Sequence, residues 1–200
     1  MKDNKETDIL AGLMGESQVN GPVVIETIQQ ADKEIWWSIY DAQFSEANKS
    51  NPCRQSFYKD EFLDALDNEN MMKLAYVKDG EVVTLCLLSN DLGYFPWLSR
   101  DYYEERLPKE MEEGNVLYFV ALLTKEDHQH QNHASEVIQL LADLCKLANN
   151  EPVVIFDCSN ETSAFLPIMI ETVVENTGQG TIKFDEIGTQ RYYEGRLKLN

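Results

Sequence analysis

The chain has 200 residues, of which 43% are hydrophobic, and it carries a formal net charge of −18 at pH 7. A chain of this length can form one domain with a substantial hydrophobic core. The negative charge repels phosphate backbones and anionic lipid surfaces, which argues against nucleic acid and membrane partners and favours a cationic, amine-bearing one. No apolar stretch is long enough to span a bilayer, and the first residues lack a signal-peptide pattern.

The four cysteines show no pairing pattern, and three of them lie in apolar runs. This is typical of reduced core cysteines in the cytoplasm, so we expect a cytoplasmic protein. Whether the protein forms a homodimer stays open at this stage.

Residues 1–21 are mostly polar and predict a flexible leader, and residues 22–200 predict a single domain. Hydrophobic periodicity, β-branched residues and turn signals indicate the elements of that domain. In chain order we expect a strand over 23–29, helices over 32–48 and 56–69, a hairpin over 71–91, a polar segment with one or two helical turns over 92–115, a buried strand over 116–124, a helix over 133–148, a strand over 152–160, a helix over 162–178, and closing strands over 181–187 and 192–199.

This order predicts a mixed α/β (α+β) fold, with a central sheet of six to seven strands flanked by about four helices. The hairpin is indicated by Asp79-Gly80, because Asp-Gly between two apolar runs favours a two-residue turn. The strand, helix and strand across 116–158 require a parallel crossover.

Three histidines, His128, His130 and His133, stand just before the helix that follows the buried strand. A zinc site would need three or four converging ligands, and no Cys-x-x-Cys or His-Glu-x-x-His pattern completes one. We therefore expect no metal.

The position of this loop suggests an anion site instead. The first turn of a helix has unpaired backbone N–H groups and a positive dipole end, which together suit a phosphate group. Such loops often need a residue with positive φ, and Asn132 is the type that best tolerates this after glycine.

The element order and this loop resemble the GNAT superfamily of acyl-CoA-dependent N-acyltransferases. The family's signature is Gln/Arg-x-x-Gly-x-Gly/Ala after its fourth strand. The corresponding residues here are Gln129, His130, Gln131, Asn132, His133 and Ala134, in which the first and last positions match and asparagine replaces the central glycine. Asn160 matches an asparagine that the family often carries after its next strand.

The resemblance implies a CoA-dependent N-acyltransferase, most simply an acetyltransferase, with acetyl-CoA or another acyl-CoA as co-substrate. The amides from Gln129 to Ala134 would bind the pyrophosphate. The edge formed by Leu122, Leu123 and Thr124 would pair with the pantetheine arm, and a backbone N–H there would polarise the thioester carbonyl. The substrate would be an amine of a small molecule or a protein.

The catalytic groups depart from the family pattern. A tyrosine is usual about seven residues after the asparagine, and this chain has Pro167 there. A water chain or Tyr118 could serve as a base, and Cys158, Ser159 and Ser163 are the nearby polar candidates for a proton donor. Tyr192 and Tyr193 are further candidates.

These departures support a second interpretation, a catalytically inactive relative that acts as a protein-interaction module. The aromatic residues of the 92–115 segment could then contact a partner. In an active enzyme they could line an acceptor pocket, and in either case they could simply pin the segment to the body of the protein.

Overall fold

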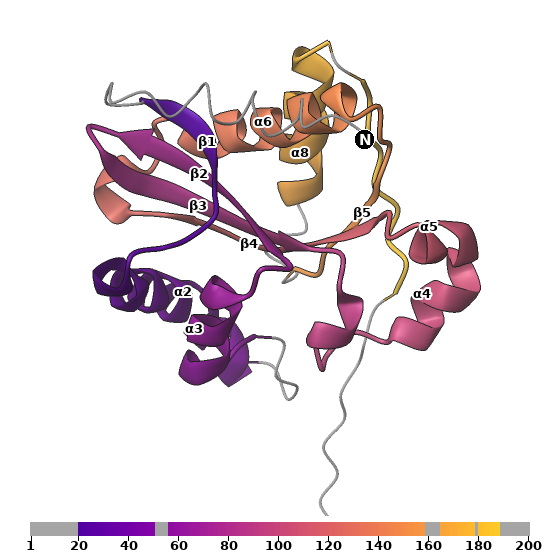
Figure 1. The fold of residues 1–200 in the computed structure, drawn as a ribbon, viewed down its shortest axis with the longest axis horizontal. Helices are drawn as coiled ribbons and strands as arrows, with labels where there is room; N and C mark the ends of the chain where they lie inside the picture. The colour runs from indigo at the N-terminus through magenta and orange to yellow at the C-terminus, as the bar shows by residue number, and fades with distance from the viewer. Residues whose placement is uncertain (1–19, 51–55, 159–164, 179, 189–200) are drawn as a thin grey trace, which may run out of the picture.

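The computed structural model describes residues 20–50, 56–158, 165–178 and 180–188. These residues form a mixed α/β fold around a five-stranded sheet in the order β1-β2-β3-β4-β5, so the predicted fold class is confirmed (Figure 1). The first four strands pair antiparallel, and β5 pairs parallel to β4. No helix within the described ranges combines the length and apolar character needed to cross a membrane.

The hairpin strands and the strand over 116–124 lie at the predicted positions. The first strand ends four residues earlier than predicted, and the strand predicted over 152–160 covers only 153–155 among the described residues. The strands are β1 Gly21–Ile25, β2 Met71–Lys78, β3 Glu81–Ser89, β4 Val116–Thr124 and β5 Val153–Ile155.

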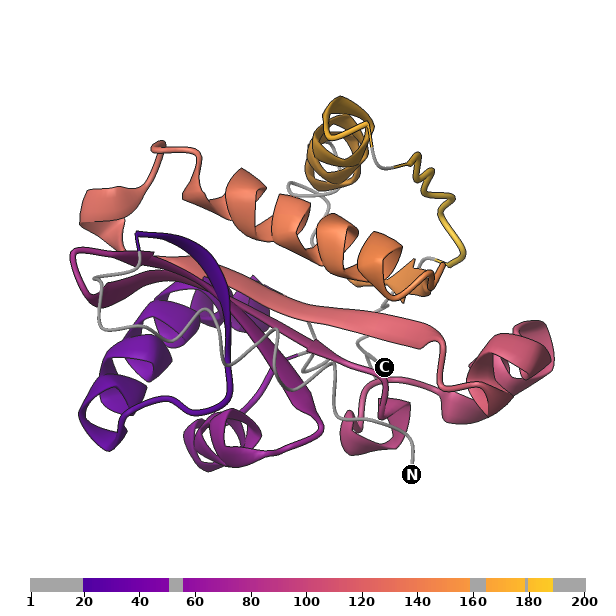
Figure 2. The same ribbon diagram turned by 45° about the horizontal axis from the view of Figure 1, so that its top comes forward.

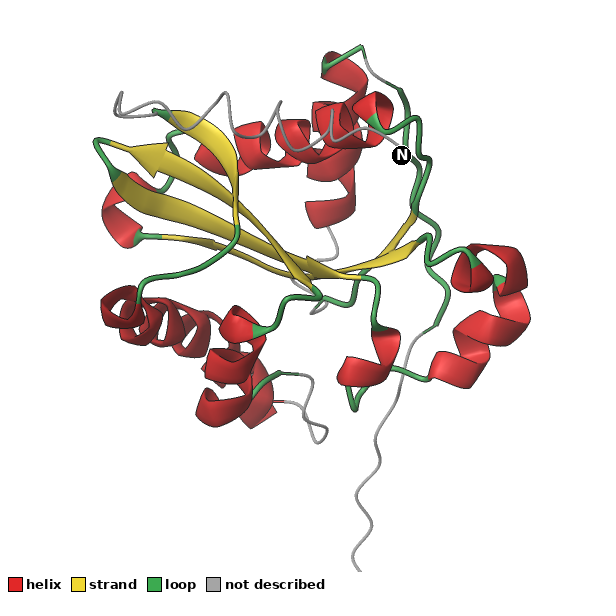
Figure 3. Cartoon of the chain, in the orientation of Figure 1, coloured by secondary structure: helices red, strands yellow, loops and turns green. Residues whose placement is uncertain are grey.

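Six α-helices lie in the described part of the chain, with two short 3-10 turns between elements (Figure 3). They are α2 Gln30–Ser50, α3 Lys59–Asp67, α4 Arg100–Arg106, α5 Pro108–Glu112, α6 His133–Leu147 and α8 Leu166–Asn176, and the 3-10 turns are η1 Leu92–Tyr94 and η2 Glu126–His128.

The hairpin between β2 and β3 turns where the sequence predicted. Asp79 has a φ of 53° and Gly80 a φ of 81°, and Lys78 pairs with Glu81 across the turn. Positive φ at both central residues is the geometry of a two-residue turn that matches the twist of its strands. The Asp-Gly signal is therefore confirmed.

The sheet lies between two helical layers, with α2 and α3 on one face and α6 and α8 on the other (Figure 2). Alternate residues of β3 face the two layers, so Leu85 and Leu87 pack on the α2 side while Cys86 and Leu88 pack on the α6 side. All four of these residues are buried, as a central strand covered on both faces requires.

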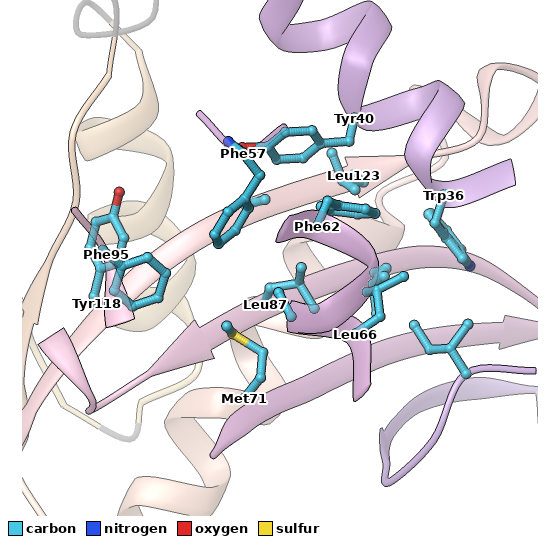
Figure 4. Close-up of a cluster of buried hydrophobic side chains, with 14 of the residues drawn as sticks. Trp36, Tyr40, Phe57, Phe62, Leu66, Met71, Leu87, Phe95, Tyr118 and Leu123 are labelled. Atoms are coloured by element: carbon cyan, nitrogen blue, oxygen red, sulfur yellow. The ribbon is translucent and has the colours of Figure 1, made fainter. Parts of the chain in front are cut away.

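The core beneath α2 and α3 is rich in aromatic residues (Figure 4). The Tyr40 and Phe62 rings lie 4.5 Å apart, and the Tyr40 hydroxyl accepts a hydrogen bond from the Phe57 backbone N–H at 3.0 Å. These contacts join the first two helices to each other and to the segment before α3. The other large residues labelled in this cluster are Trp36, Leu66, Met71, Leu87, Phe95, Tyr118 and Leu123.

The prediction of a closing strand over 181–187 is wrong, because this segment contains no strand. It lies instead against α8, where the Phe184 backbone N–H donates to Glu171 at 3.0 Å and Lys183 pairs with the same carboxylate at 3.1 Å. Phe184 also packs edge-on against Phe156, with ring centroids 5.0 Å apart. The alternating apolar residues of 181–187 thus reflect packing against α8 and the segment after β5.

The described residues form a sheet of five strands where six to seven were expected. The second expected closing strand, over 192–199, and most of the predicted leader over 1–21 lie outside the described residues.

Candidate functional site

β4 has a free inner edge because β5 covers only its beginning. The parallel pairing joins Val116, Leu117 and Tyr118 to β5 and ends at Tyr118, while β4 continues to Thr124. Among the described residues, the remaining part of β4 pairs with β3 alone. The two parallel strands therefore diverge, which leaves strand hydrogen-bonding groups available on the inner side.

A bulge lies at the point of divergence. Leu87 pairs with Ala121 and Leu88 with Phe119, so Val120 is an extra residue in β4. A bulge bends its strand and increases the local twist, which carries the end of β4 away from the line of β5. No feature of the sequence predicted it.

The loop after β4 is shaped by two residues with positive φ. His130 has a φ of 59° and Asn132, immediately before α6, a φ of 68°. Asn132 thus adopts the conformation for which it was singled out, whereas the same conformation at His130 was not anticipated. The Asn132 side chain does not cap the helix, so the first-turn amides of α6 have no side-chain partner from it.

The free edge and the loop share a pocket of about 580 Å³. Gln43 of α2 and Met169 of α8 bound it on opposite sides of the sheet. The other lining residues are Leu122, Thr124, His128, Gln129, His130, Gln131, Asn132, His133 and Ala134.

Almost all of the predicted cofactor-binding residues therefore meet in one place. Leu123 is the exception, because its side chain is fully buried in the core beneath α2. The Leu122 carbonyl accepts a long hydrogen bond of 3.5 Å from the Gln43 side-chain nitrogen, so this group of the edge already has a partner. Asn160 lies outside the described residues.

A second hollow of about 410 Å³ extends the pocket between α6 and α8. Asn132 and Met169 line both, so the two hollows adjoin. The remaining lining is mostly polar and consists of Ser135, Glu136, Gln139, Thr172, Val173, Asn176 and Thr177.

His133, the first residue of α6, is buried at 7% exposure and stacks on Tyr76 with ring centroids 4.0 Å apart. Neither ring nitrogen has a hydrogen-bond partner within the described part of the chain, and the same holds for Nδ1 of His128. Desolvation lowers the pKa of His133, and the positive charge of Lys78 acts in the same direction. His133 is therefore neutral at pH 7, and its one ring N–H is buried beside Tyr76.

The histidines do not gather as metal ligands. The His128 and His133 ring centroids are 6.2 Å apart, and no group of three metal-binding side chains occurs among the described residues. Lys78, from the end of β2, donates to the Gln131 side chain at 3.0 Å and places a positive charge beside the loop.

Tyr118 has the wrong surroundings for the base suggested from the sequence. Its phenol is buried and donates a hydrogen bond to Asp157. Burial, and next the Asp157 charge, raise its pKa far above the ordinary value, so Tyr118 keeps its proton.

Cys158 is exposed, although its apolar strand suggested a core position. Partial desolvation and the Asp157 charge raise the pKa of its thiol, which favours the protonated form. Ser159, Ser163, Tyr192 and Tyr193 lie outside the described residues.

Most aromatic residues of the 92–115 segment pack inward, and Tyr102 is the exposed exception. Tyr94, Phe95, Trp97 and Tyr103 contact the core beneath α2 and α3, which fits the interpretation that they pin the segment to the body. Trp97 also donates to the Tyr118 hydroxyl at 2.9 Å.

Sequence reasoning missed Asp157, the partner of Tyr118. The available signal was a carboxylate that directly follows an apolar strand, a position at which functional residues often occur in α/β proteins.

No family model matches the sequence, and no curated protein matches it significantly. Among solved structures, the chain is similar to an aminoglycoside acetyltransferase from an uncultured soil metagenomic sample, with 12% identity and a TM-score of 0.44 over 88% of this chain and 97% of that one. It is also similar to an aminoglycoside 6'-N-acetyltransferase from Acinetobacter baumannii, with 10% identity and a TM-score of 0.45 over 89% and 100% of the two chains. A ribosomal-protein-alanine N-acetyltransferase from Brucella melitensis gives 12% identity and a TM-score of 0.46 over 87% and 99%. Similarity at this level does not by itself assign an activity or a substrate to this chain.

Proposed function

We propose that the protein is an acyl-CoA-dependent N-acyltransferase, most simply an acetyltransferase, that acylates an amine. The observation that carries the proposal is the free inner edge of β4, which begins after Tyr118 and leads into a pocket at the N-terminus of α6. An extended polar arm can pair with such an edge, and a helix N-terminus suits its phosphate groups.

The described residues fit this co-substrate. The backbone amides from His130 to Ala134 would hold the pyrophosphate, because Asn132 turns the chain into α6 without capping it. The predicted Gln129 amide is already used, since it donates to the Glu126 carbonyl at 3.1 Å. The hollow between α6 and α8 continues from that point and would receive the distal part of the molecule. Leu122 and Thr124 would pair with the pantetheine arm along the edge of β4.

The net charge of −18 opposes a polyanionic co-substrate at long range. Lys78 offsets this at the loop, because its ammonium group lies 3.0 Å from the Gln131 side chain. The same net charge favours a cationic amine as the acceptor. A cytoplasmic location and a homodimer stay predictions.

Binding of acetyl-CoA tests the proposal. Titration calorimetry and thermal unfolding should show saturable binding and a rise in Tm, because a ligand that binds only the folded state stabilises it. No binding at millimolar acetyl-CoA would refute the proposed function.

A charge-adding variant locates the site. Ala134→Glu puts a carboxylate in the first turn of α6, where it favours the helix but repels a bound phosphate, so we expect at least ~10-fold weaker binding and an unchanged fold. Gln30→Glu adds the same charge at the start of α2, away from the pocket, and should bind acetyl-CoA like the unmodified protein. Equal binding by both variants would place the ligand elsewhere.

A further inference from the structure

A chain of three hydrogen-bonding side chains lies where β4 and β5 diverge. The indole N–H of Trp97 donates to the Tyr118 hydroxyl at 2.9 Å, and that hydroxyl donates to a carboxylate oxygen of Asp157. The three groups come from the segment before α4, from β4 and from the segment after β5. Trp97 and Tyr118 are 21 residues apart in the sequence, and Tyr118 and Asp157 are 39 residues apart.

One oxygen of the Asp157 carboxylate is held by Tyr118, and the residue is exposed to solvent. Tyr118 pairs with Ile155, the last residue of β5, and Asp157 follows two positions later on the same face. Tyr118 is 2% exposed, whereas Asp157 is an exposed residue. One carboxylate oxygen is thus anchored by a buried phenol while the side chain remains accessible from solvent.

No ion pair among the described residues neutralises Asp157. Desolvation raises the pKa of Asp157, and the hydrogen bonds from the Tyr118 hydroxyl and from the backbone of Asp157 itself oppose that rise. The charge of Asp157 in turn raises the pKa of Tyr103 of α4 and of Cys158. A carboxylate without a protein cation, held beside aromatic rings, is suited to meet a cation from outside.

The free edge of β4 leads toward this carboxylate. Six residues separate Thr124, at the pocket, from Tyr118, so at ~3.3 Å per residue the edge is ~20 Å long. An extended arm that entered at the loop would run along this edge, and its reactive end would lie toward Asp157.

We propose that Asp157 binds the protonated form of a primary amine and accepts its proton, with Tyr118 and Trp97 as positioning residues. This inference rests on the proposed acyltransferase function and names the substrate class and the base of that reaction.

The step balances as follows. One N–H bond of the ammonium group breaks and an O–H bond forms on Asp157, which leaves a lone pair on the neutral amine nitrogen. That pair forms the new C–N bond at the thioester carbon, the C–S bond breaks, and the sulfur leaves with its electron pair. The second amine proton goes to the sulfur, giving an amide and a free thiol, and Asp157 releases its proton to solvent.

The test compares two amines with acetyl-CoA as donor and free thiol as the readout. Spermidine is protonated at neutral pH and needs a base, whereas methoxyamine is already neutral. Asp157→Asn should lower kcat/KM for spermidine by ~100-fold or more, within the usual range for general-base catalysis, and should affect methoxyamine far less. Asp157→Glu should restore part of the spermidine rate. The fall in kcat/KM at low pH, which reports protonation of Asp157, should disappear in Asp157→Asn.

Two further variants separate this role from a structural one. Glu151→Gln removes an exposed carboxylate just before β5 and should keep the full rate with both amines. Tyr118→Phe keeps the ring but frees the carboxylate, so it should shift the acid limb of the pH profile and lower the spermidine rate less than Asp157→Asn.

Acetyl-CoA binding is measured on every variant and reports on the proposed function alone. If acetyl-CoA binds but the unmodified protein turns over neither amine, or if Asp157→Asn slows both amines equally, the inference about Asp157 is overturned while the co-substrate site stands. If acetyl-CoA does not bind, the proposed function fails, and the inference fails with it.

Discussion

The left-handed conformation of Asn132 allows a prediction that depends on the backbone alone. Its φ is 68° and its ψ 2°, and its side chain makes no capping bond to α6. For a residue with an ordinary Cβ this conformation costs ~1–2 kcal/mol, whereas asparagine tolerates it better. Asn132→Ala should therefore destabilise the protein by ~1 kcal/mol, without removing any hydrogen bond of the helix cap.

Glycine at the same position separates backbone strain from side-chain loss. Asn132→Gly removes the Cβ and relieves the strain, but the unfolded chain gains freedom worth ~0.5–1 kcal/mol, so the net change should be small. For a domain of this size, ~1 kcal/mol corresponds to a fall in Tm of ~2–4 °C. We therefore expect the unmodified protein and Asn132→Gly to have similar Tm values, and Asn132→Ala to have the lowest.

Thermal denaturation followed by circular dichroism measures this order, and Gln139→Ala serves as the control. Gln139 is an exposed residue of α6 in the ordinary helical conformation, so its replacement should change stability by less than ~0.5 kcal/mol. Acetyl-CoA affinity should fall in Asn132→Ala and be retained in Asn132→Gly. If Asn132→Ala unfolds at the same temperature as Asn132→Gly, the turn does not require a positive φ and the reasoning is refuted.

Two further predictions concern stability. The folded state lowers the pKa of His133 below its ordinary value of 6.5, so the unfolded chain takes up a proton first as the pH falls. The stability that His133 contributes is therefore present above pH 6.5 and is lost as the pH falls below it. His133→Phe keeps an aromatic ring against Tyr76 but cannot take up a proton. In urea titrations, this variant should lose less stability than the unmodified protein between about pH 7.5 and about pH 5.5. An equal loss in both proteins would contradict this. Phe62 is fully buried among the Tyr40, Trp37 and Phe57 rings, so Phe62→Ala should cost ~3–5 kcal/mol in the same titrations, and a cost below ~1 kcal/mol would mean that this core is not packed as described.

Local signals in the sequence predicted the elements whose geometry is set by neighbouring residues. Asp79-Gly80 determines its turn by the φ values that the two residues tolerate, and Asn132 does the same before α6. The buried strand Val116–Thr124 was recognisable because both of its faces are apolar.

Features that depend on distant partners could not be predicted in this way. The bulge at Val120 is a matter of register between β3 and β4, and any apolar residue could occupy it. The role proposed for Asp157 depends on its hydrogen bond with Tyr118, which is 39 residues away in the chain. The alternation of apolar and polar residues in 181–187 resembles a strand. In the structure, however, the Phe184 backbone N–H donates to Glu171 of α8 and not to a neighbouring strand.

The free edge of β4 also has a consequence for self-association. Unpaired strand edges on a protein surface can recruit strands from other molecules and lead to aggregation. Here Gln43 of α2 and Met169 of α8 stand on either side of the exposed stretch, and the amide of Gln43 already lies near the Leu122 carbonyl. A strand from another molecule would have to displace these two side chains before it could pair with β4, so we expect strand pairing between molecules to be disfavoured at that position.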